Sequence, residues 1–175
     1  MKKIFGIGIA RTALVPDGYA GGGEAVRPSP SDAEAHLNQG NVYYDKRDYD
    51  SAIGEYGEAI RLNPNYADAY NNRANAYFGK GDIDKAIGDY TEAIRLNPNY
   101  ASAYSNRGNA YFNKRDYDRA IAEYGETVRL NPNYATAYYN RGNAYKNKGD
   151  FARARADWEK VLQINPNDDG ARNNL

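Results

Sequence analysis

Closely spaced pairs of acidic side chains are the first feature of the sequence that could do chemistry, because paired carboxylates can bind a divalent cation. The pairs are Asp48/Asp50, Asp82/Asp84 and Asp116/Asp118. A calcium loop would also supply a glycine at its turn and a closing glutamate, and the pairs lack both. Each pair falls where a helix is expected to begin, an end that carboxylates stabilise. The pairs therefore predict helix caps, and we expect no metal site.

Groups that could perform catalysis are scarce. His36 is the one histidine in the sequence, and there is no cysteine. An active site needs convergent groups with tuned protonation, and no nucleophile–base pair or phosphate-binding loop is visible. We therefore expect no catalytic residue and no cofactor, and a chain that is not an enzyme.

Eight asparagines are the strongest candidates for a binding role. They form four equally spaced pairs: Asn38/Asn41, Asn72/Asn75, Asn106/Asn109 and Asn140/Asn143. Asparagine is a mediocre helix former, so on propensity alone its replacement by alanine would not lower stability. A carboxamide both donates and accepts hydrogen bonds without adding charge, so it can pair with a peptide bond. Alternatively, the pairs were copied from one founding unit and have no binding role.

A fixed period of 34 residues governs where these side chains stand. The heptapeptide RLNPNYA occurs unchanged at 61–67, 95–101 and 129–135, and a diverged copy, QINPNDD, begins at Gln163. A constant period of this length indicates stacked structural units, each burying its apolar face against the next.

One unit, 67–100, predicts two helices joined by a short turn. Its second half carries an apolar stripe at helical spacing, formed by Ile83, Ala86, Ile87, Tyr90, Ala93 and Ile94. Its first half carries a shorter stripe of Tyr70, Ala74 and Tyr77. The glycines of 79–81 break the chain between the two halves, and Asp82 is positioned to cap the second helix. Asn97 precedes a proline and therefore ends that helix.

The repeated small, aromatic and proline positions resemble the tetratricopeptide repeat (TPR) motif. The matching positions are Gly40, Ala74, Gly108 and Gly142; Tyr43, Tyr77, Tyr111 and Tyr145; Ala52, Ala86, Ala120 and Ala154; Tyr56, Tyr90, Tyr124 and Trp158; and Pro64, Pro98, Pro132 and Pro166. The chain departs from the motif at two positions, with tyrosine in place of tryptophan at Tyr70, Tyr104 and Tyr138 and arginine in place of leucine at Arg73, Arg107 and Arg141.

The resemblance implies an all-α fold, a right-handed α-solenoid of four 34-residue helix-turn-helix repeats whose first helices line a concave groove. The expected boundaries are a leader at 1–32, repeats at 33–66, 67–100, 101–134 and 135–168, and a short C-terminal cap at 169–175. Lys2 and Lys3 before an apolar run give residues 1–20 some character of a secretory signal, although Arg11 interrupts the run. We expect a cytoplasmic protein, or a secreted or periplasmic one if that segment is a signal peptide.

A helical wheel places the asparagines away from the packing stripe. With Tyr70 at zero, Asn72 falls near ~200° and Asn75 near ~140°. Three aromatic residues, Tyr44, Phe78 and Phe112, fall near ~80°, where the fourth unit has Lys146. The resemblance implies that such asparagine ladders hold an extended peptide by its backbone, so the eight asparagines and these three aromatic residues form the predicted peptide-binding site.

The repeated arginines fall nearer the packing stripe than the asparagines, at about 300° on the wheel. We expect them to pair with second-helix carboxylates such as Glu55, Asp89 or Glu123. Chaperone-binding members of the family clamp a carboxylate with asparagines and cations. Uncharged residues stand where the cations would be needed, at Leu37, Asn71, Ser102, Ser105, Asn106 and Thr136. Binding of an acidic tail is therefore not expected.

Charge and hydropathy narrow the choice of partners. The 23 basic and 23 acidic residues balance, whereas a nucleic-acid binder usually carries a basic excess. No apolar run is long enough to span a membrane. We expect a scaffold that binds an extended segment of a partner protein, and the alternative is a self-assembly module. Because the chain after Pro166 is short cover for the last apolar stripe, we also expect weak self-association through the last helix.

Overall fold

The structure, a computed structural model, describes residues 30–175, and its regular elements there are all helices. They are α1 (Pro30–Asp45), α2 (Tyr49–Leu62), α3 (Ala67–Lys80), α4 (Ile83–Leu96), α5 (Ala101–Asn113), α6 (Tyr117–Leu130), α7 (Ala135–Asn147), α8 (Phe151–Ile164) and α9 (Asp169–Asn173). The predicted leader and its signal-like part lie outside the described residues, except that residues 30–32 already belong to α1.

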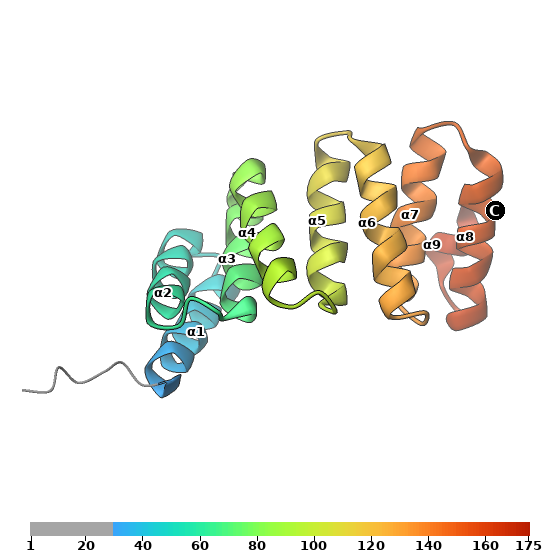
Figure 1. The fold of residues 1–175 in the computed structure, drawn as a ribbon. Coiled ribbons are helices and arrows are strands. Elements are labelled where there is room, and N and C mark those ends of the chain that lie inside the picture. The colour runs from blue at the N-terminus through green and yellow to red at the C-terminus, as the bar shows by residue number, and fades with distance from the viewer. Residues whose placement is uncertain (1–29) are drawn as a thin grey trace, which may run out of the picture.

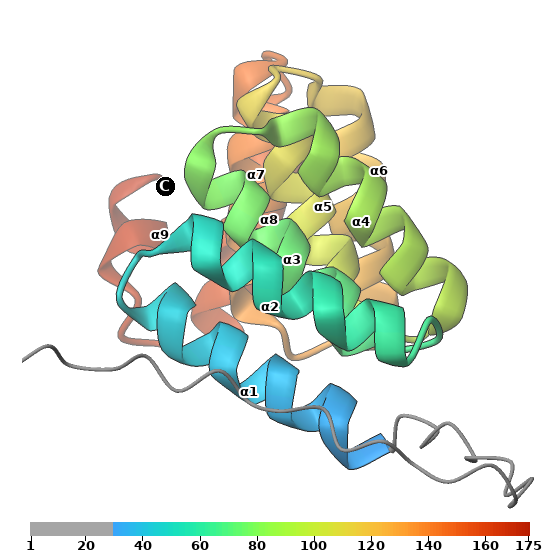
Figure 2. The same ribbon diagram turned by 90° about the vertical axis from the view of Figure 1, so that its left-hand side faces the viewer.

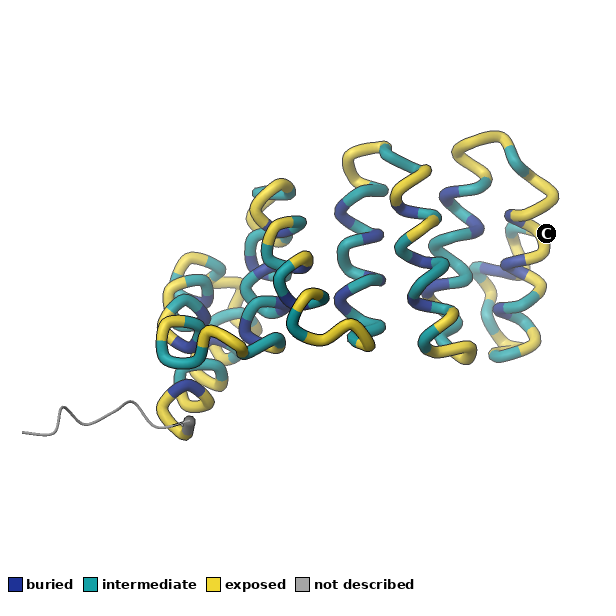
Figure 3. Tube along the Cα trace, in the orientation of Figure 1, coloured by how far each residue is buried: buried dark blue, intermediate teal, exposed yellow. Residues whose placement is uncertain are grey.

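The first eight helices form four antiparallel pairs that stack side by side (Figures 1 and 2). Each pair packs against the next through the second helix of one and the first helix of the following pair. This arrangement confirms the predicted right-handed α-solenoid of helix-turn-helix repeats. In Figure 3 the buried positions lie along the lines where neighbouring helices face each other.

The acidic pairs predicted as helix caps have two different roles. Asp48 and Asp116 each accept a hydrogen bond from a backbone N–H in the first turn of the following helix, which confirms their capping role. Asp150, which is not part of a predicted pair, does the same at the start of α8. Asp82 also stands at a helix start, but its carboxylate pairs with Lys85 instead of the backbone. The second acid of each pair binds a lysine of the next unit, in the ion pairs Asp50–Lys80, Asp84–Lys114 and Asp118–Lys148.

The turn between the two helices of each pair requires a residue in the left-handed conformation. Gly81 and Gly149 fill this position with φ of 88° and 80°. Arg47 and Arg115 occupy the equivalent position with φ of 60°, a conformation that is unfavourable for a residue with a Cβ. Of the predicted turn at 79–81, Gly79 stays within α3 and only Gly81 makes the turn.

The core is a row of small clusters, each crossing the boundary between two units. One aromatic residue of the second helix, such as Tyr90, lies between Ala74 of its own pair and Ala110 of the next. Glycine on the first helix leaves room for the ring where the two helices lie close together, because a Cβ on Gly108 would lie 2.7 Å from the Tyr124 ring. The motif's small residues are therefore required by packing within each pair.

The two ends of the array differ in how they are covered. At the C-terminal end, α9 inserts Ala171 into a cluster with Trp158 and Val161, so most of the last stripe is buried. Phe151 remains 66% exposed. At the other end Val42 on α1 is 45% exposed, although the equivalent Ala76, Ala110 and Ala144 are fully buried. An apolar residue therefore stays exposed at both ends of the array, Val42 on α1 and Phe151 on α8.

Among residues 30–175, no helix has both the length and the apolar character that crossing a bilayer requires. The same residues contain no group of three or more histidine, cysteine or acidic side chains placed to hold a metal ion.

Candidate functional site

The asparagines of neighbouring units are joined by side-chain hydrogen bonds. The Oδ1 atom of Asn75 accepts a hydrogen bond from the Tyr90 hydroxyl at 2.6 Å and another from Nδ2 of Asn106 at 3.2 Å. Tyr90 lies on α4 of the same pair, whereas Asn106 lies on α5 of the next. One amide group thus connects three helices across a unit boundary.

The boundaries on either side repeat this arrangement, with distances between 2.7 and 3.1 Å. The equivalent bonds join Asn41 to Tyr56 and Asn72, and Asn109 to Tyr124 and Asn140. We call the six residues Asn41, Asn72, Asn75, Asn106, Asn109 and Asn140 the asparagine ladder.

Within the described residues, Asn41, Asn75 and Asn109 keep free amide N–H groups, whereas Asn106 and Asn140 keep free amide oxygens. The Oδ1 atoms of Asn41, Asn75 and Asn109 each accept two hydrogen bonds, which is the capacity of an amide oxygen. Their Nδ2 groups donate to no other described residue, and the three side chains are half-buried. The internal bonds therefore fix the amides with their N–H groups available to an acceptor outside the ladder.

Aromatic side chains divide the open side of the ladder into three adjoining pockets of about 80, 230 and 240 Å³. Tyr44 and Asn75 line both the first pocket and the second. Phe78 and Asn109 line both the second and the third. Because each pocket shares its walls with the next, the three form one continuous depression, which we call the asparagine groove.

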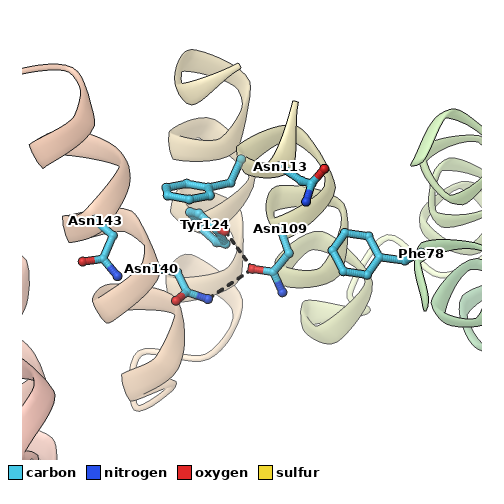
Figure 4. Close-up of a pocket in the computed structure, with 7 residues that line it drawn as sticks. Phe78, Asn109, Asn113, Tyr124, Asn140 and Asn143 are labelled. Atoms are coloured by element: carbon cyan, nitrogen blue, oxygen red, sulfur yellow. Dashed lines mark hydrogen bonds between the residues drawn. The ribbon is translucent and has the colours of Figure 1, made fainter. Parts of the chain in front are cut away.

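The third pocket is the largest of the three (Figure 4). Asn109 lies between Tyr124 and Asn140 and is hydrogen-bonded to both, while Phe78 reaches in from the neighbouring unit. Phe112, Asn113 and Asn143 complete the lining. The pocket therefore combines apolar walls with several carboxamides and no charged side chain.

Asn38 and Asn143, the first and last of the eight predicted asparagines, are not part of the hydrogen-bonded ladder. Asn38 is exposed and lines none of the three pockets. Asn143 lines the third pocket, but its side chain makes no hydrogen bond within residues 30–175. The reason lies in α8, where Trp158 stands in place of the tyrosine that donates to the asparagine in the other units; its Nε1 is buried without a partner in the described structure.

Sequence reasoning did not assign two further asparagines, one that bonds to the ladder and one that lines the groove. Asn71 is 5% exposed, accepts from Asn106 at 3.3 Å and donates to Asn72 at 3.2 Å. Asn113 lines the third pocket. Neither position holds asparagine in every unit, so the periodic pattern did not select them, although Asn113 directly follows the predicted Phe112.

The repeated arginines lie outside the groove lining, and each forms an ion pair with a carboxylate of its own unit through two hydrogen bonds. The pairs are Arg73–Asp89, Arg107–Glu123 and Arg141–Asp157, at 2.6–2.9 Å. The first two confirm the predicted partners. The prediction for Glu55 is wrong, because Gln39 stands at the arginine position of its unit and Glu55 bonds to His36 at 2.7 Å.

Burial and ion pairing shift the pKa values of the tyrosines beside the ladder and of the arginine–carboxylate pairs. Desolvation raises the pKa of the Tyr90 and Tyr124 hydroxyls, so both remain neutral donors to the ladder. The hydrogen bond from Arg73 to Asp89 raises the pKa of the guanidinium. Burial raises the pKa of Glu123 against the opposing effect of Arg107. None of these groups forms the nucleophile–base arrangement that catalysis requires.

A solenoid of helix pairs with an uncharged groove is typical of a scaffold for protein–protein interaction. Family models described as TPR repeat match residues 40–81, 74–115 and 108–149, and one described as tetratricopeptide repeat matches 135–168. The chain therefore belongs to the tetratricopeptide repeat family. A search of curated proteins gives no match.

Several solved structures are similar over most of the chain. A crystal structure of MamA is 30% identical, with a TM-score of 0.74 over 79% of this chain and 81% of that chain. The first TPR of Spaghetti (RPAP3), bound to the HSP90 peptide SRMEEVD, is 28% identical, with a TM-score of 0.68 over 71% and 99%. The TPR domain of Arabidopsis OM64 is 29% identical, with a TM-score of 0.66 over 67% and 97%.

Family membership and these neighbours support a scaffold for protein–protein interaction that is not an enzyme.

Proposed function

We propose that the chain binds an extended segment of a partner protein in the asparagine groove, with the ladder amides donating to the main-chain carbonyls of that segment. The observation that carries the proposal is the fixed orientation of Asn41, Asn75 and Asn109. Their oxygens are saturated internally, and their N–H groups have no partner within the described residues. A half-buried donor gains most from an acceptor that arrives with a ligand.

Apolar contact supplies the second part of the proposed interaction. Tyr44, Phe78 and Phe112 form walls between successive pockets. Side chains of an extended segment alternate in direction, so some would enter the pockets while the carbonyls face the ladder. The neighbour bound to the HSP90 peptide shows that the same fold can hold a peptide.

The test is a peptide display library selected on the full chain, followed by titration of the selected peptides against Asn109→Asp. This change keeps the oxygen that accepts from Tyr124 and Asn140, and it replaces the N–H donor by a charged oxygen that repels a carbonyl. We expect about tenfold weaker binding or more, since one lost hydrogen bond and a repulsion together exceed ~1.4 kcal/mol.

The matched control is Asn133→Asp, which adds the same charge at an exposed position in the turn between α6 and α7. It should leave both affinity and melting temperature unchanged. Selected peptides that bind Asn109→Asp as tightly as the unaltered chain would contradict the proposal.

A second candidate function is self-assembly, and it is favoured by the outer face of α1. Ala35 and Val42 are exposed there, whereas their equivalents Ala69 and Ala76 in the next unit are buried against α2. A face with the composition of a packing surface can pair with another copy of the chain.

A further inference from the structure

The asparagine groove is uncharged along its length but has a charge of opposite sign at each end. None of the residues that line the three pockets is acidic or basic. The charges lie just beyond the first and third pockets, on α1 and α7.

Lys146 provides the positive end. It stands on α7 at the position that holds Tyr44, Phe78 and Phe112 in the other units, so it continues the row of groove walls. Its Nζ lies 5.7 Å from the centre of the Trp158 ring and 3.5 Å from Oδ1 of Asn174. Within residues 30–175 it contacts no carboxylate, so its charge is available to a ligand.

Asp45 provides the negative end. It stands on α1 at the position equivalent to Asn113, which lines the third pocket. The residues that line the first pocket are equivalent to those around Asn113 in the third, and Asp45 directly follows Tyr44, so the carboxylate stands beside the first pocket. Asp45 is exposed and has no cationic partner in the described part of the chain.

We propose that the ligand is an extended segment with an apolar, uncharged middle, a cationic side chain that meets Asp45 at one end and a carboxylate that meets Lys146 at the other. This inference rests on the proposed function, because it assigns the chemistry of the segment held by the ladder. It also orients the ligand, since the reversed placement would bring like charges together at both ends.

The length of the segment follows from the spacing of the units. Three unit steps separate Asp45 from Lys146, which is roughly 25–30 Å for helices packed about 8–10 Å apart. An extended chain rises about 3.3 Å per residue, so about eight or nine residues span the two charges.

The experiment uses acetylated, amidated nine-residue peptides that keep the middle of a library-selected peptide. Their end residues are lysine and glutamate in both orders, two lysines, two glutamates or two glutamines. Affinities are measured by fluorescence anisotropy at low and high salt against the full chain. We expect one lysine–glutamate peptide to bind about two- to fivefold more tightly than either peptide with like charges, and this preference to shrink at high salt.

Charge reversal tests each end separately. Lys146→Glu should shift the preference to the two-lysine peptide, and Asp45→Lys should shift it to the two-glutamate peptide. Both residues are exposed, so neither change should alter the melting temperature. The matched control is Lys160→Glu, which makes the same change on α8, outside the groove lining.

Equal affinity for all the peptides would overturn the proposal, and so would a preference that changes in only one of the two variants. These failures differ from failure of the groove itself. If the peptides bind in a manner that depends on Asn109 but not on end charge, only the charge assignment is wrong. If Asn109→Asp has no effect, the groove proposal fails first.

Discussion

At the scale of single residues, the ladder asparagines have a structural role beside the binding role that we propose for them. The oxygen of Asn75 accepts a hydrogen bond from the hydroxyl of Tyr90, a buried residue, and the same side chain lines a pocket with its N–H groups unpaired among the described residues. Helix propensity alone predicts that alanine would be tolerated at such a position. The hydrogen bond reverses that expectation, because alanine would leave a buried hydroxyl without its acceptor.

Removing one tyrosine hydroxyl that donates to the ladder measures how much this hydrogen bond contributes to stability. Tyr124→Phe deletes the 2.7 Å hydrogen bond to Asn109 and keeps the ring in place. We expect unfolding to become about 1 kcal/mol easier, seen as a melting temperature lower by a few degrees. The matched control is Tyr117→Phe on the same helix, whose hydroxyl makes no hydrogen bond to a described residue. Equal melting temperatures for the two variants would show that the ladder bond adds nothing to stability.

At the scale of helices, the ends were predictable from sequence because short-range chemistry fixes them. Aspartates cap helix starts, and the residue before each repeated proline ends a helix in an extended conformation, as at Asn97. The partners of the asparagines were not predictable in the same way. The bond from Asn106 to Asn75 joins residues 31 apart in sequence and depends on how two units stack. A wheel drawn for one helix contains no information about that contact.

The inter-helix turn supplies a prediction at this scale. Arg115→Gly should stabilise the chain by about 1 kcal/mol, because glycine adopts the φ of 60° without the steric cost of a Cβ. Gly149→Ala places a Cβ at the equivalent position, where φ is 80°, and should destabilise by a similar amount. Urea titration of both variants checks the pair. A loss of stability in Arg115→Gly would mean that the arginine side chain has a role that outweighs its backbone strain.

At the scale of the whole molecule, the period of 34 residues determined the architecture, but the ends of the array needed the structure. Sequence reasoning assigned weak self-association to the last helix. The structure places α9 over Trp158 and Val161, which leaves Phe151 as the main exposed apolar residue of that helix. On α1, by contrast, Val42 lies on a face that is fully buried in every following unit. We therefore expect association through the first helix.

Val42→Lys tests that expectation. A lysine on this face should weaken pairing between copies, because each association would bury a charge. Since the residue is 45% exposed, the melting temperature of the dilute chain should change little. Sedimentation velocity over a wide concentration range compares this variant with Phe151→Lys, the equivalent change at the other end. We expect the unaltered chain and Phe151→Lys to associate alike at high concentration and Val42→Lys to stay monomeric. If Phe151→Lys alone abolishes association, the contact lies at the last helix after all.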